Sequence, residues 1–371
     1  MPFRGLRVVY LFSADSYRGS AVSFQHLASG LTELGGVPRL LTGHASVTEP
    51  LRAEGLDVVQ LDLSATSLRT ALRLRRELRT FGAEVLVVDR PRDLRLGMLA
   101  TIGTKIALVS RYNSHAPKPP CDVLTRLAYR FVVRELIFLT HGMAHRVLTA
   151  APWMRRPGHC VIPEGICLST FRPDAEAAAA FRARHALGDA PFVLAVGALT
   201  REKRTAMIVD AMRRMPTPPT LVLCGEGPLR EALRAQAEVL GVPVRLVGRV
   251  RRAELRGAYS AASVVVHACA VETFGLSVLE AMACGAPVVG VRSGGVVDVV
   301  GASGDAGILV NADDVDAMAT AVGRVLDDAV LAGRLRVGAR ARAAGHFPLE
   351  RMTARYSRAV LGAWSREEVG F

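Results

Sequence analysis

The stretch HACAVETFGLSVLEAMACGAPVVGVRSGG, residues 267–295, decides the fold class of this chain. It predicts a buried strand, a loop, a helix from about Phe274 to Gly285, and then a second buried strand. Glu272 falls in the loop and Glu280 in the helix. At ~1.5 Å of rise per residue, Glu280 stands roughly 7–8 Å up the helix axis, whereas Glu272 precedes the first turn. The two carboxylates are therefore predicted to hold two ends of an extended ligand rather than to share one proton or metal ion.

The same alternation of short apolar runs with helix-like segments continues outward through the chain. It is typical of parallel strands covered by helices on both faces. Strands are predicted at 8–12, 85–88 and 106–109, and again at 192–196, 221–223, 244–247, 264–267 and 287–291. We therefore predict an α/β protein made of doubly wound, Rossmann-like sheets.

At 371 residues the chain exceeds the usual size of a single core, which predicts two domains. The segment 165–174 carries Gly, Pro and polar residues and is expected to be a hinge. We predict an N-terminal acceptor-binding domain at 1–168, a C-terminal nucleotide-sugar domain at 169–348, and a last helix at 349–371 that packs back on the first domain. A deep cleft between the carboxyl edges of the two sheets is expected to bind the ligands.

Charge and cysteine content restrict the class of protein. The net charge of +13 divides into +10 before Pro173 and +3 after it. The basic first half suits an anionic substrate or an anionic membrane surface, although an Arg-rich solvated surface is the alternative; no nucleic-acid partner is expected. No apolar run approaches the ~20 residues that a membrane-spanning helix needs. Asp15 and Arg18 interrupt the apolar run at the start of the chain too early for a signal peptide. The six cysteines form no CxxC pair. We expect a cytoplasmic protein, with the inner face of the plasma membrane as the alternative location.

The predicted helix start offers an anion site between the two carboxylates. Free N–H groups around Gly275 and Leu276 are suited to a diphosphate, because a helix N-terminus carries partial positive charge. A carboxylate accepts hydroxyl hydrogen bonds well, at about 1.5–3 kcal/mol each. A sugar at Glu272 and a ribose at Glu280 would place a nucleotide-diphosphate-sugar along this segment.

The segment ETFGLSVLEAMACGAPVV resembles the Glu-x7-Glu motif of family 4 glycosyltransferases, which have the GT-B fold and retain anomeric configuration. Further segments resemble the family in its order: VIPEGICLSTFRP (161–173), VGALTREKR (196–204), LCGEGPLREAL (223–233) and VRLVGRV (244–250). The resemblance is strong over about 160–310. In the N-terminal half, VDRPRDLRLGMLA (88–100) with SRYNS resembles members that act on lipopolysaccharide core or other cell-envelope glycolipids.

The resemblance implies roles for particular residues of the donor site. The first Glu of the motif, Glu272, faces the donor sugar, and Lys203 holds the diphosphate; the family Arg is missing at Ala198, and Arg201 is expected to replace it. These three charged residues, Glu272, Lys203 and Arg201, form the predicted catalytic set. The predicted donor-binding residues are Gly19, Glu280, Arg249, Val250, Thr273, Phe274, Gly275 and Leu276.

Two of these assignments have plain structural alternatives. Gly19 lies in YRGSAVSFQHLASGL (17–31), which resembles the family's glycine-rich loop entering the first helix, but Ser20 would also cap an ordinary helix there. Lys203 is one of only three lysines, which favours a function, although a solvated lysine at a helix start is the alternative.

The acceptor side departs further from the family. Where many members place a His after the fifth strand, this chain has VSRYNSHAP (109–117), and in the hinge segment Glu164 and Cys167 replace the Asn and Asp often found there. The predicted acceptor-binding residues are Arg90, Arg92, Arg111 and His115, with solvation of a loop as the alternative for the first two. The segments 67–81 and 123–139 combine apolar spacing with Arg, as interfacial helices do, although core packing is equally compatible.

No Asp-x-Asp pair and no His/Cys/Asp cluster at ligand spacing occurs near the donor segments. We therefore predict a metal-independent hexosyltransferase without cofactor, in which Lys203, Arg201 and a helix dipole offset the diphosphate charge. Its acceptor would be a hydroxyl of a glycan or glycolipid in envelope polysaccharide or lipopolysaccharide synthesis. A nucleotide-sugar epimerase and a catalytically degenerate binding protein are the alternatives. A dehydrogenase is disfavoured, because no GxGxxG follows the first strand.

Overall fold

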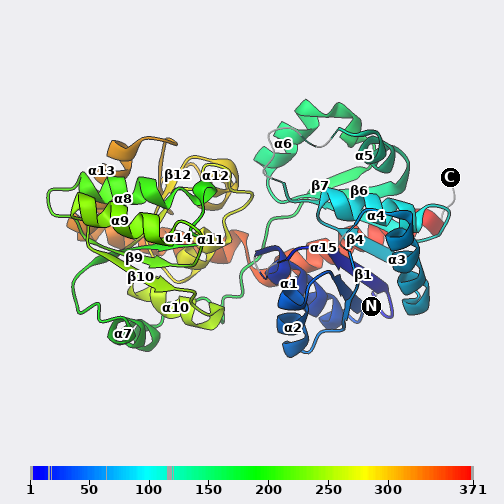
Figure 1. Cartoon of the computed structure of the whole chain (residues 1–371), viewed down its shortest axis with the longest axis horizontal. Coiled ribbons are helices and arrows are strands. Elements are labelled where there is room, and N and C mark those ends of the chain that lie inside the picture. Colours follow the sequence, from blue (N-terminus) through cyan, green and yellow to red (C-terminus); the bar gives the residue numbers. More distant parts are fainter. Residues whose placement is uncertain are drawn as a thin grey trace. The chain divides into compact units, whose positions relative to one another are not determined.

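The computed structural model describes residues 3–15, 17, 19–63, 65–114, 119 and 121–368 of the chain. It forms two compact units, each with its own sheet and core (Figure 1). The N-terminal unit comprises Met1–Gly165 together with Leu349–Phe371, and the C-terminal unit comprises Ile166–Pro348. The chain therefore passes from the first unit to the second at the start of the predicted hinge segment, and returns at Leu349.

The N-terminal unit is built on a seven-stranded sheet in the order β3-β2-β1-β4-β5-β6-β7, in which every pair is parallel. Its strands are β1 Arg7–Phe12, β2 Val37–Thr42, β3 Val58–Gln60, β4 Val85–Val88, β5 Ala107–Tyr112, β6 Val133–Phe138 and β7 Gly158–Val161. The central strands are continuous apolar runs, such as VLVV in β4, because helices bury both faces of a parallel sheet.

Helices connect the strands of this sheet and cover its faces. They are α1 Gly19–Glu33, α2 Ala45–Ala53, α3 Leu68–Phe81, α4 Pro91–Thr101, α5 Val123–Leu127, α6 His141–Ala150 and α15 Leu349–Glu368, with short turns η1 Ala128–Val132 and η2 Pro152–Arg155. Local signals define α3 at both ends. The Ser67 hydroxyl accepts from Thr70 N at 3.1 Å, and Gly82 adopts a left-handed conformation with φ 70°.

The segment 123–139 is not one interfacial helix. Only Val123–Leu127 is α-helical, a π turn follows, and the run VRELIF becomes the largely buried strand β6 between β5 and β7. The apolar run of β6 is long enough to fill one strand of a sheet that is covered on both faces, and this outweighs the helix-like spacing of the segment. The other proposed interfacial segment is helical, as α3.

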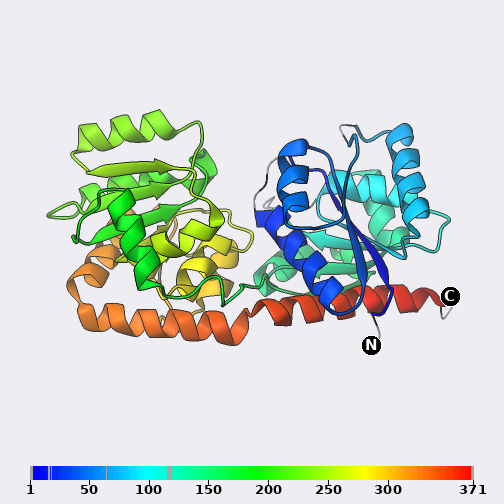
Figure 2. The same cartoon turned by 90° about the horizontal axis from the view of Figure 1, so that it is seen from below.

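The C-terminal helix α15 packs on the N-terminal unit (Figure 2). Met352, Tyr356, Val360 and Ala363 of α15 belong to the same core cluster as the first strands and α1. The two helices approach closely at Gly30, where an added Cβ would lie 2.4 Å from the Thr353 side chain. Glycine at this position therefore sets the contact distance between α1 and α15.

The C-terminal unit has a six-stranded parallel sheet in the order β10-β9-β8-β11-β12-β13. Its strands are β8 Phe192–Val196, β9 Thr220–Cys224, β10 Val244–Gly248, β11 Val264–His267, β12 Val288–Val291 and β13 Ile308–Val310. Its helices are α7 Ala175–Arg184, α8 Thr205–Arg213, α9 Arg230–Leu240, α10 Arg252–Ala261, α11 Leu276–Ala283, α12 Gly294–Val300, α13 Val315–Asp327 and α14 Ala329–His346, with the short turn η3 Arg201–Lys203. The strand order reverses between β8 and β11, and ligands bind at such a switch point in open α/β sheets. The predicted fold class is confirmed in both units.

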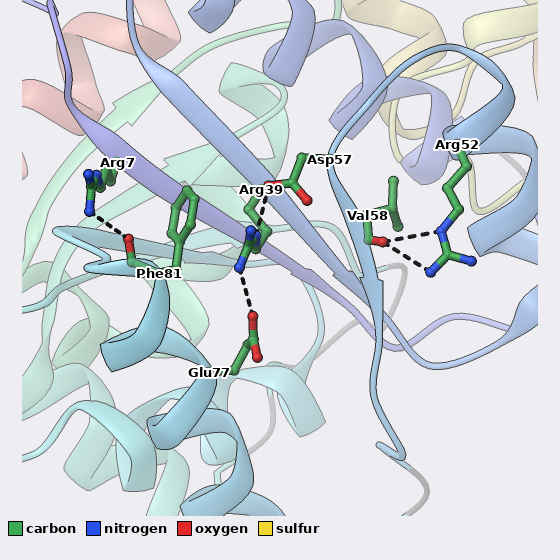
Figure 3. Close-up of polar contacts among 7 residues, drawn as sticks. All are labelled: Arg7, Arg39, Arg52, Asp57, Val58, Glu77 and Phe81. Carbon is green, nitrogen blue, oxygen red and sulfur yellow. Dashed lines mark hydrogen bonds and ion pairs between the residues drawn. The ribbon is translucent and has the colours of Figure 1, made fainter.

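Some arginines of the N-terminal unit form ion pairs and hydrogen bonds within the unit (Figure 3). Arg39 bridges Asp57 and Glu77 at 2.8 and 2.9 Å, and Arg52 donates two hydrogen bonds of 3.2 Å to the carbonyl of Val58. These arginines stabilise the edge of the sheet at β2 and β3. The excess of arginine in this half is thus not entirely free to meet an anionic partner. None of the helices in the described part of the chain is long and apolar enough to cross a bilayer.

Asp93, in the first turn of α4, makes the stability of the N-terminal unit pH-dependent. Its side chain is fully buried; one oxygen accepts from Ser13 N at 3.2 Å, and the other has no partner among the described residues. Burial raises the pKa of Asp93 to about 7. Between its unfolded pKa of about 3.9 and pH 7 the native state keeps the proton that the unfolded state loses, so the free energy of unfolding falls as pH rises.

We expect Asp93→Asn to remove this penalty. The stability gain over wild type should grow by about 2–3 kcal/mol between pH 5 and pH 8, because one pKa unit corresponds to ~1.4 kcal/mol. Both tryptophans of the chain, Trp153 and Trp364, lie in the N-terminal unit, so tryptophan fluorescence during urea unfolding reports this unit. Glu33→Gln, which changes an exposed carboxyl group of the same unit, is the control. A stability gain that does not change with pH would contradict the prediction.

Candidate functional site

The predicted donor segment lies at the carboxyl edge of the C-terminal sheet. β11 ends at His267, the loop that follows carries Glu272, and α11 begins at Leu276 after Gly275, whose φ is 100°. α11 has no side-chain N-cap, so its first N–H groups receive no capping bond from a side chain. A helix N-terminus of this kind binds anions. The strand, loop and helix predicted for this segment are confirmed, with the helix two residues shorter at each end.

Lys203 and Glu272 form an ion pair at this edge. Lys203 Nζ lies 2.6 Å from Glu272 Oε2, and the side chains are 30% and 10% exposed. Burial would lower the pKa of Lys203, but the carboxylate of Glu272 outweighs it and raises that pKa. Burial would likewise raise the pKa of Glu272, but the contacts with His267 and Lys203 hold it well below its usual range. Both groups are therefore charged at neutral pH, and the partly exposed ammonium can reach an anion.

Two further side chains surround Glu272. His267 Nε2 lies 3.2 Å from Glu272 Oε2 without a hydrogen bond of good geometry, and the ligand atoms of His267, Cys269 and Glu272 all lie within 4.8 Å of one another. The sequence showed no cluster of metal-ligating side chains at ligand spacing near the donor segments, but the structure brings these three side chains together, and metal independence stays a prediction. The loop after β11 turns Glu272 back toward the strand end, which the spacing H-x-C-x-x-E does not reveal.

Glycines after β12 hold the backbone of the Glu272 loop in place. Gly295 N donates to Glu272 O at 3.0 Å, and Ser293 Oγ donates to Cys269 O at 2.6 Å. Gly294 has φ 45°, and a Cβ on it would lie 2.0 Å from Glu272 O. Only glycine lets the two backbones approach this closely, so the sequence RSGG positions the catalytic candidate Glu272 from a neighbouring strand.

Glu280 is buried in the second turn of α11 and already has two donors. Arg252 Nε lies 3.2 Å from one oxygen and the Tyr259 hydroxyl lies 3.1 Å from the other. Burial raises the pKa of Glu280, and the Arg252 charge and the Tyr259 hydrogen bond oppose this rise. A carboxylate has about four acceptor positions, so two remain for the hydroxyls of a ribose. Arg252 and Tyr259 were not predicted from the sequence, because both come from α10.

The side chains of the other predicted donor residues differ in their exposure to solvent. Arg201, at the start of η3, and Arg249, after β10, are exposed, and Val250 and Thr273 are half-buried. Phe274 is buried and packs edge-on against Phe347, with ring centroids 5.8 Å apart. Its side chain therefore belongs to the core, so a donor contact at Phe274 would have to come from its backbone.

In the N-terminal unit, the predicted residues differ in position and burial. Gly19 is the exposed first residue of α1, at the carboxyl edge of its sheet. Arg90 is exposed at the N-cap of α4, and Arg92 is half-buried in its first turn. His115 lies outside the described residues. Arg111 is fully buried.

Arg111 is the centre of a buried polar network below this edge. Its Nη2 forms an ion pair with Glu164 Oε1, and Ser23 Oγ donates to the other oxygen of Glu164 at 2.7 Å. The side chains of Arg111 and Glu164 are 1% and 5% exposed. Burial would lower the pKa of Arg111, but the negative charges of Glu164 and Asp89 raise it. The replacement Glu164 in the hinge segment thus has a structural partner, which the sequence did not indicate because the two residues are far apart in the chain.

Asp89 extends this network toward the sheet edge. Burial raises its pKa, and Arg111 and Asn113 oppose the rise. Asn113 donates to Ser20 Oγ at 2.9 Å and lies 3.4 Å from Asp89. Ser20 is thus tied to the end of β5 as well as lying in the first turn of α1.

Comparisons with known proteins define the class of the fold and of one domain. The fold of the two units is GT-B: the Anabaena protein Alr3699/HepE, solved in complex with UDP, matches with a TM-score of 0.84 at 16% identity, over 96% of this chain and 100% of that chain. Residues 178–343 match the family Glycosyl transferases group 1. The C-terminal unit therefore contains a glycosyltransferase group 1 domain.

Two curated relatives align with the chain over different lengths. The GDP-mannose-dependent alpha-(1-6)-phosphatidylinositol monomannoside mannosyltransferase of Mycolicibacterium smegmatis is 36% identical over 192 residues, which is 48% of this chain and 50% of that protein. The sulfoquinovosyl transferase SQD2 of Arabidopsis thaliana is 26% identical over 334 residues, covering 82% of this chain and 63% of that protein. The chain thus spans half to two thirds of the length of these relatives.

Proposed function

We propose that this chain is a retaining, metal-independent glycosyltransferase. It would move a hexose-type sugar from a nucleotide-diphosphate donor to a hydroxyl of a glycan or glycolipid acceptor in envelope polysaccharide or lipopolysaccharide synthesis. One observation carries the proposal. Along one edge of the C-terminal sheet lie, in order, the Lys203–Glu272 ion pair, the start of α11 without a side-chain cap, and the buried carboxyl group of Glu280. The named activities of the relatives, all sugar transfers, agree with it.

In the proposed reaction these groups bind the donor and stabilise its leaving group. Ribose hydroxyls would donate to Glu280, the diphosphate would lie at the start of α11, and the sugar would lie at Glu272. Negative charge grows on the diphosphate as the glycosidic bond breaks. The Lys203 ammonium is partly exposed, and it would turn from Glu272 toward this charge, with Arg201 as a second cation. Preformed positive groups aimed at developing charge stabilise the transition state more than the ground state.

The acceptor would be bound by the N-terminal unit, where Arg90, Arg92 and Arg111 were predicted to act. Because Arg111 is buried in an ion pair, we assign it to positioning the end of β5 and leave direct acceptor contact to Arg90 and Arg92. Activity that persists in EDTA would support metal independence. Product whose anomeric configuration matches that of the donor, measured by NMR, would support retention.

The test of the donor site is a calorimetric screen of UDP, GDP, ADP and their sugars against the full chain in EDTA. One nucleotide class should bind saturably, and Glu280→Gln should weaken it about 10- to 100-fold, since hydrogen bonds to a charged group contribute about 1.5–3 kcal/mol. The exposed Glu238→Gln, on α9, is the matched control. If no nucleotide binds to wild type, the degenerate binding protein becomes the better interpretation; unchanged binding by Glu280→Gln would remove Glu280 from the site.

We also propose that the N-terminal unit contacts anionic membrane surfaces. Three helical segments, α3, α4 and α5 with η1, lie side by side on one face of the sheet, and large apolar side chains are exposed on the outer two. Leu72 of α3 is 57% exposed beside Arg69, Arg73 and Arg76, and Phe131 of η1 is 64% exposed. Apolar side chains interleaved with arginine are typical of surfaces that lie in the lipid headgroup region.

Sedimentation with vesicles tests this surface. We expect binding to vesicles that contain phosphatidylglycerol and little binding to pure phosphatidylcholine. Leu72→Ser combined with Phe131→Ser should weaken binding at least about tenfold, since burying one such side chain contributes about 1.5–3 kcal/mol. Val239→Ser, which removes an 85% exposed side chain from the C-terminal unit, is the control. Equal binding by the double variant and the control would contradict the proposal.

A further inference from the structure

We propose that His267, Cys269 and Glu272 form a binding site for a thiophilic divalent cation such as Zn²⁺, and that the bound cation inhibits the transferase. The inhibitory part rests on the proposed function, because the cation would take Glu272 away from the sugar and from Lys203. The binding part rests only on the geometry of three side chains. It assigns to this edge of the sheet a regulatory site in a transferase whose proposed reaction uses no metal.

The donor set matches the chemistry of zinc. An imidazole nitrogen, a thiolate sulfur and a carboxylate oxygen are its usual ligands, and three protein ligands with an open fourth position are typical of accessible zinc sites. All three residues come from one segment of six residues, at the end of β11 and in the loop that follows. The strand fixes His267, so the chelate needs no rearrangement of distant elements.

The distances require only small side-chain movements. The three ligand atoms lie within 4.8 Å of one another, and His267 Nε2 lies 3.2 Å from Glu272 Oε2. Bonds of about 2.0–2.3 Å to a central ion place tetrahedral ligands roughly 3.3–3.8 Å apart. His267 and Cys269 are 6% and 2% exposed, and Nε2 of His267 has no hydrogen-bond partner among the described residues. A buried imidazole nitrogen 3.2 Å from a carboxylate oxygen, on a ring whose ligand atom lies within 4.8 Å of a thiol, is poised for a cation.

Room for a fourth ligand lies beside the cluster. A cavity of about 20 Å³ is lined by Lys203, His267 and the ends of β8 and β11. This volume is enough for about one water molecule. Of the three proposed ligands only His267 lines this cavity, so a water there would approach the proposed cation from the His267 side.

Lys203 is the competitor of the proposed cation. Its ammonium lies 2.6 Å from the same Glu272 oxygen that faces His267, so it provides the positive charge there when no metal is bound. On binding, the Cys269 thiol loses its proton to solvent and the M–S bond forms. Glu272 exchanges the ammonium for the metal, and Lys203 turns outward. The neutral imidazole, the thiolate and the carboxylate together balance the charge of the cation.

The test is a Co²⁺ titration of the full chain followed by absorbance. We expect one equivalent of Co²⁺ to produce a thiolate-to-cobalt charge-transfer band and the d–d bands of a tetrahedral ion, and one equivalent of Zn²⁺ to remove them. Cys269→Ser should abolish the charge-transfer band. Cys224→Ser, which changes an equally buried cysteine outside the cluster, should keep it. Far-UV circular dichroism checks that each variant is folded, and His267→Asn gives a second loss-of-site variant.

Competition between Lys203 and the cation for Glu272 predicts a variant that binds the cation more tightly. Lys203→Met should bind Co²⁺ at least about tenfold more tightly than wild type, because it removes a cation from the site. If wild type shows no charge-transfer band, or if the band persists in Cys269→Ser, the proposed cation site is wrong. If Lys203→Met binds Co²⁺ with the affinity of wild type, the proposed competition is wrong. The spectra do not depend on transferase activity, so their failure is distinguishable from failure of the proposed function. If Zn²⁺ slows sugar transfer by wild type but not by Cys269→Ser, the inhibitory role is supported; equal slowing of both overturns it.

Discussion

Lys203→Met is expected to lower kcat for sugar transfer about 100- to 1000-fold, with a smaller change in KM. The loss has the size found when one preformed electrostatic donor is removed from an active site. Lys203 Nζ lies 2.6 Å from Glu272 Oε2, and the Lys203 side chain is 30% exposed. The ammonium is therefore held at the proposed sugar position and stays accessible to an anion there. Initial rates of nucleotide release, measured with the donor that the calorimetric screen identifies, give the value.

The chain offers a matched control for this variant. Lys105→Met removes another of the three lysines from an exposed position in the N-terminal unit and should leave kcat unchanged. If Lys203→Met retains more than a third of wild-type kcat, Lys203 does not stabilise the leaving group. In that case its pairing with Glu272 is only structural, and the mechanism needs another cation.

Glu164→Gln is expected to destabilise the N-terminal unit by about 3 kcal/mol, because it leaves the Arg111 charge buried without its main counter-ion. Glutamine preserves the shape of the side chain and can still accept the Ser23 hydroxyl, so the loss reports the charge. Asp89 compensates for part of it, since its carboxyl also interacts with the guanidinium. Urea unfolding followed by the two tryptophans measures the effect in the unit that contains the pair.

An exposed ion pair of the same unit is the reference. Glu49→Gln removes the partner of Arg52 in a solvent-exposed pair and should cost less than about 0.5 kcal/mol. Combining Arg111→Met with Glu164→Leu removes both buried charges and should be less destabilising than Glu164→Gln alone. Equal effects of Glu164→Gln and Glu49→Gln would show that Arg111 does not need its partner.

The predicted strands lie at or close to the predicted residues because a short apolar run is visible in the local sequence, whereas β2, β3, β7 and β13 were not predicted and β6 was taken as helix. β4, β8 and β11 occupy the predicted residues, since a strand covered on both faces must be a short apolar run. The same rule explains the error at 123–139. The apolar run in that segment is compatible with both a strand and a helix. It forms a strand because it pairs with β5 on one side and with β7 on the other.

The donor candidates were also found where they are continuous in sequence. Glu272, Gly275 and Glu280 lie on one strand-loop-helix segment, so their order along the sheet edge follows from their spacing. The partners of these residues were missed. Arg252 reaches Glu280 from α10, and Gly294 fixes the Glu272 loop from the start of α12. Neither contact has a signature in the local sequence.

By itself, the sequence determined the α/β class, the restart of the strand pattern in the second half, and the placement of the donor candidates on one segment. These features depend on local periodicity and on residues that are neighbours in the chain. Only the tertiary structure decided that Arg111 is neutralised by Glu164 and that His267 and Cys269 gather around Glu272. The physical reason is that burial and turn geometry choose the partner of a charged side chain, and both arise only when distant segments pack together.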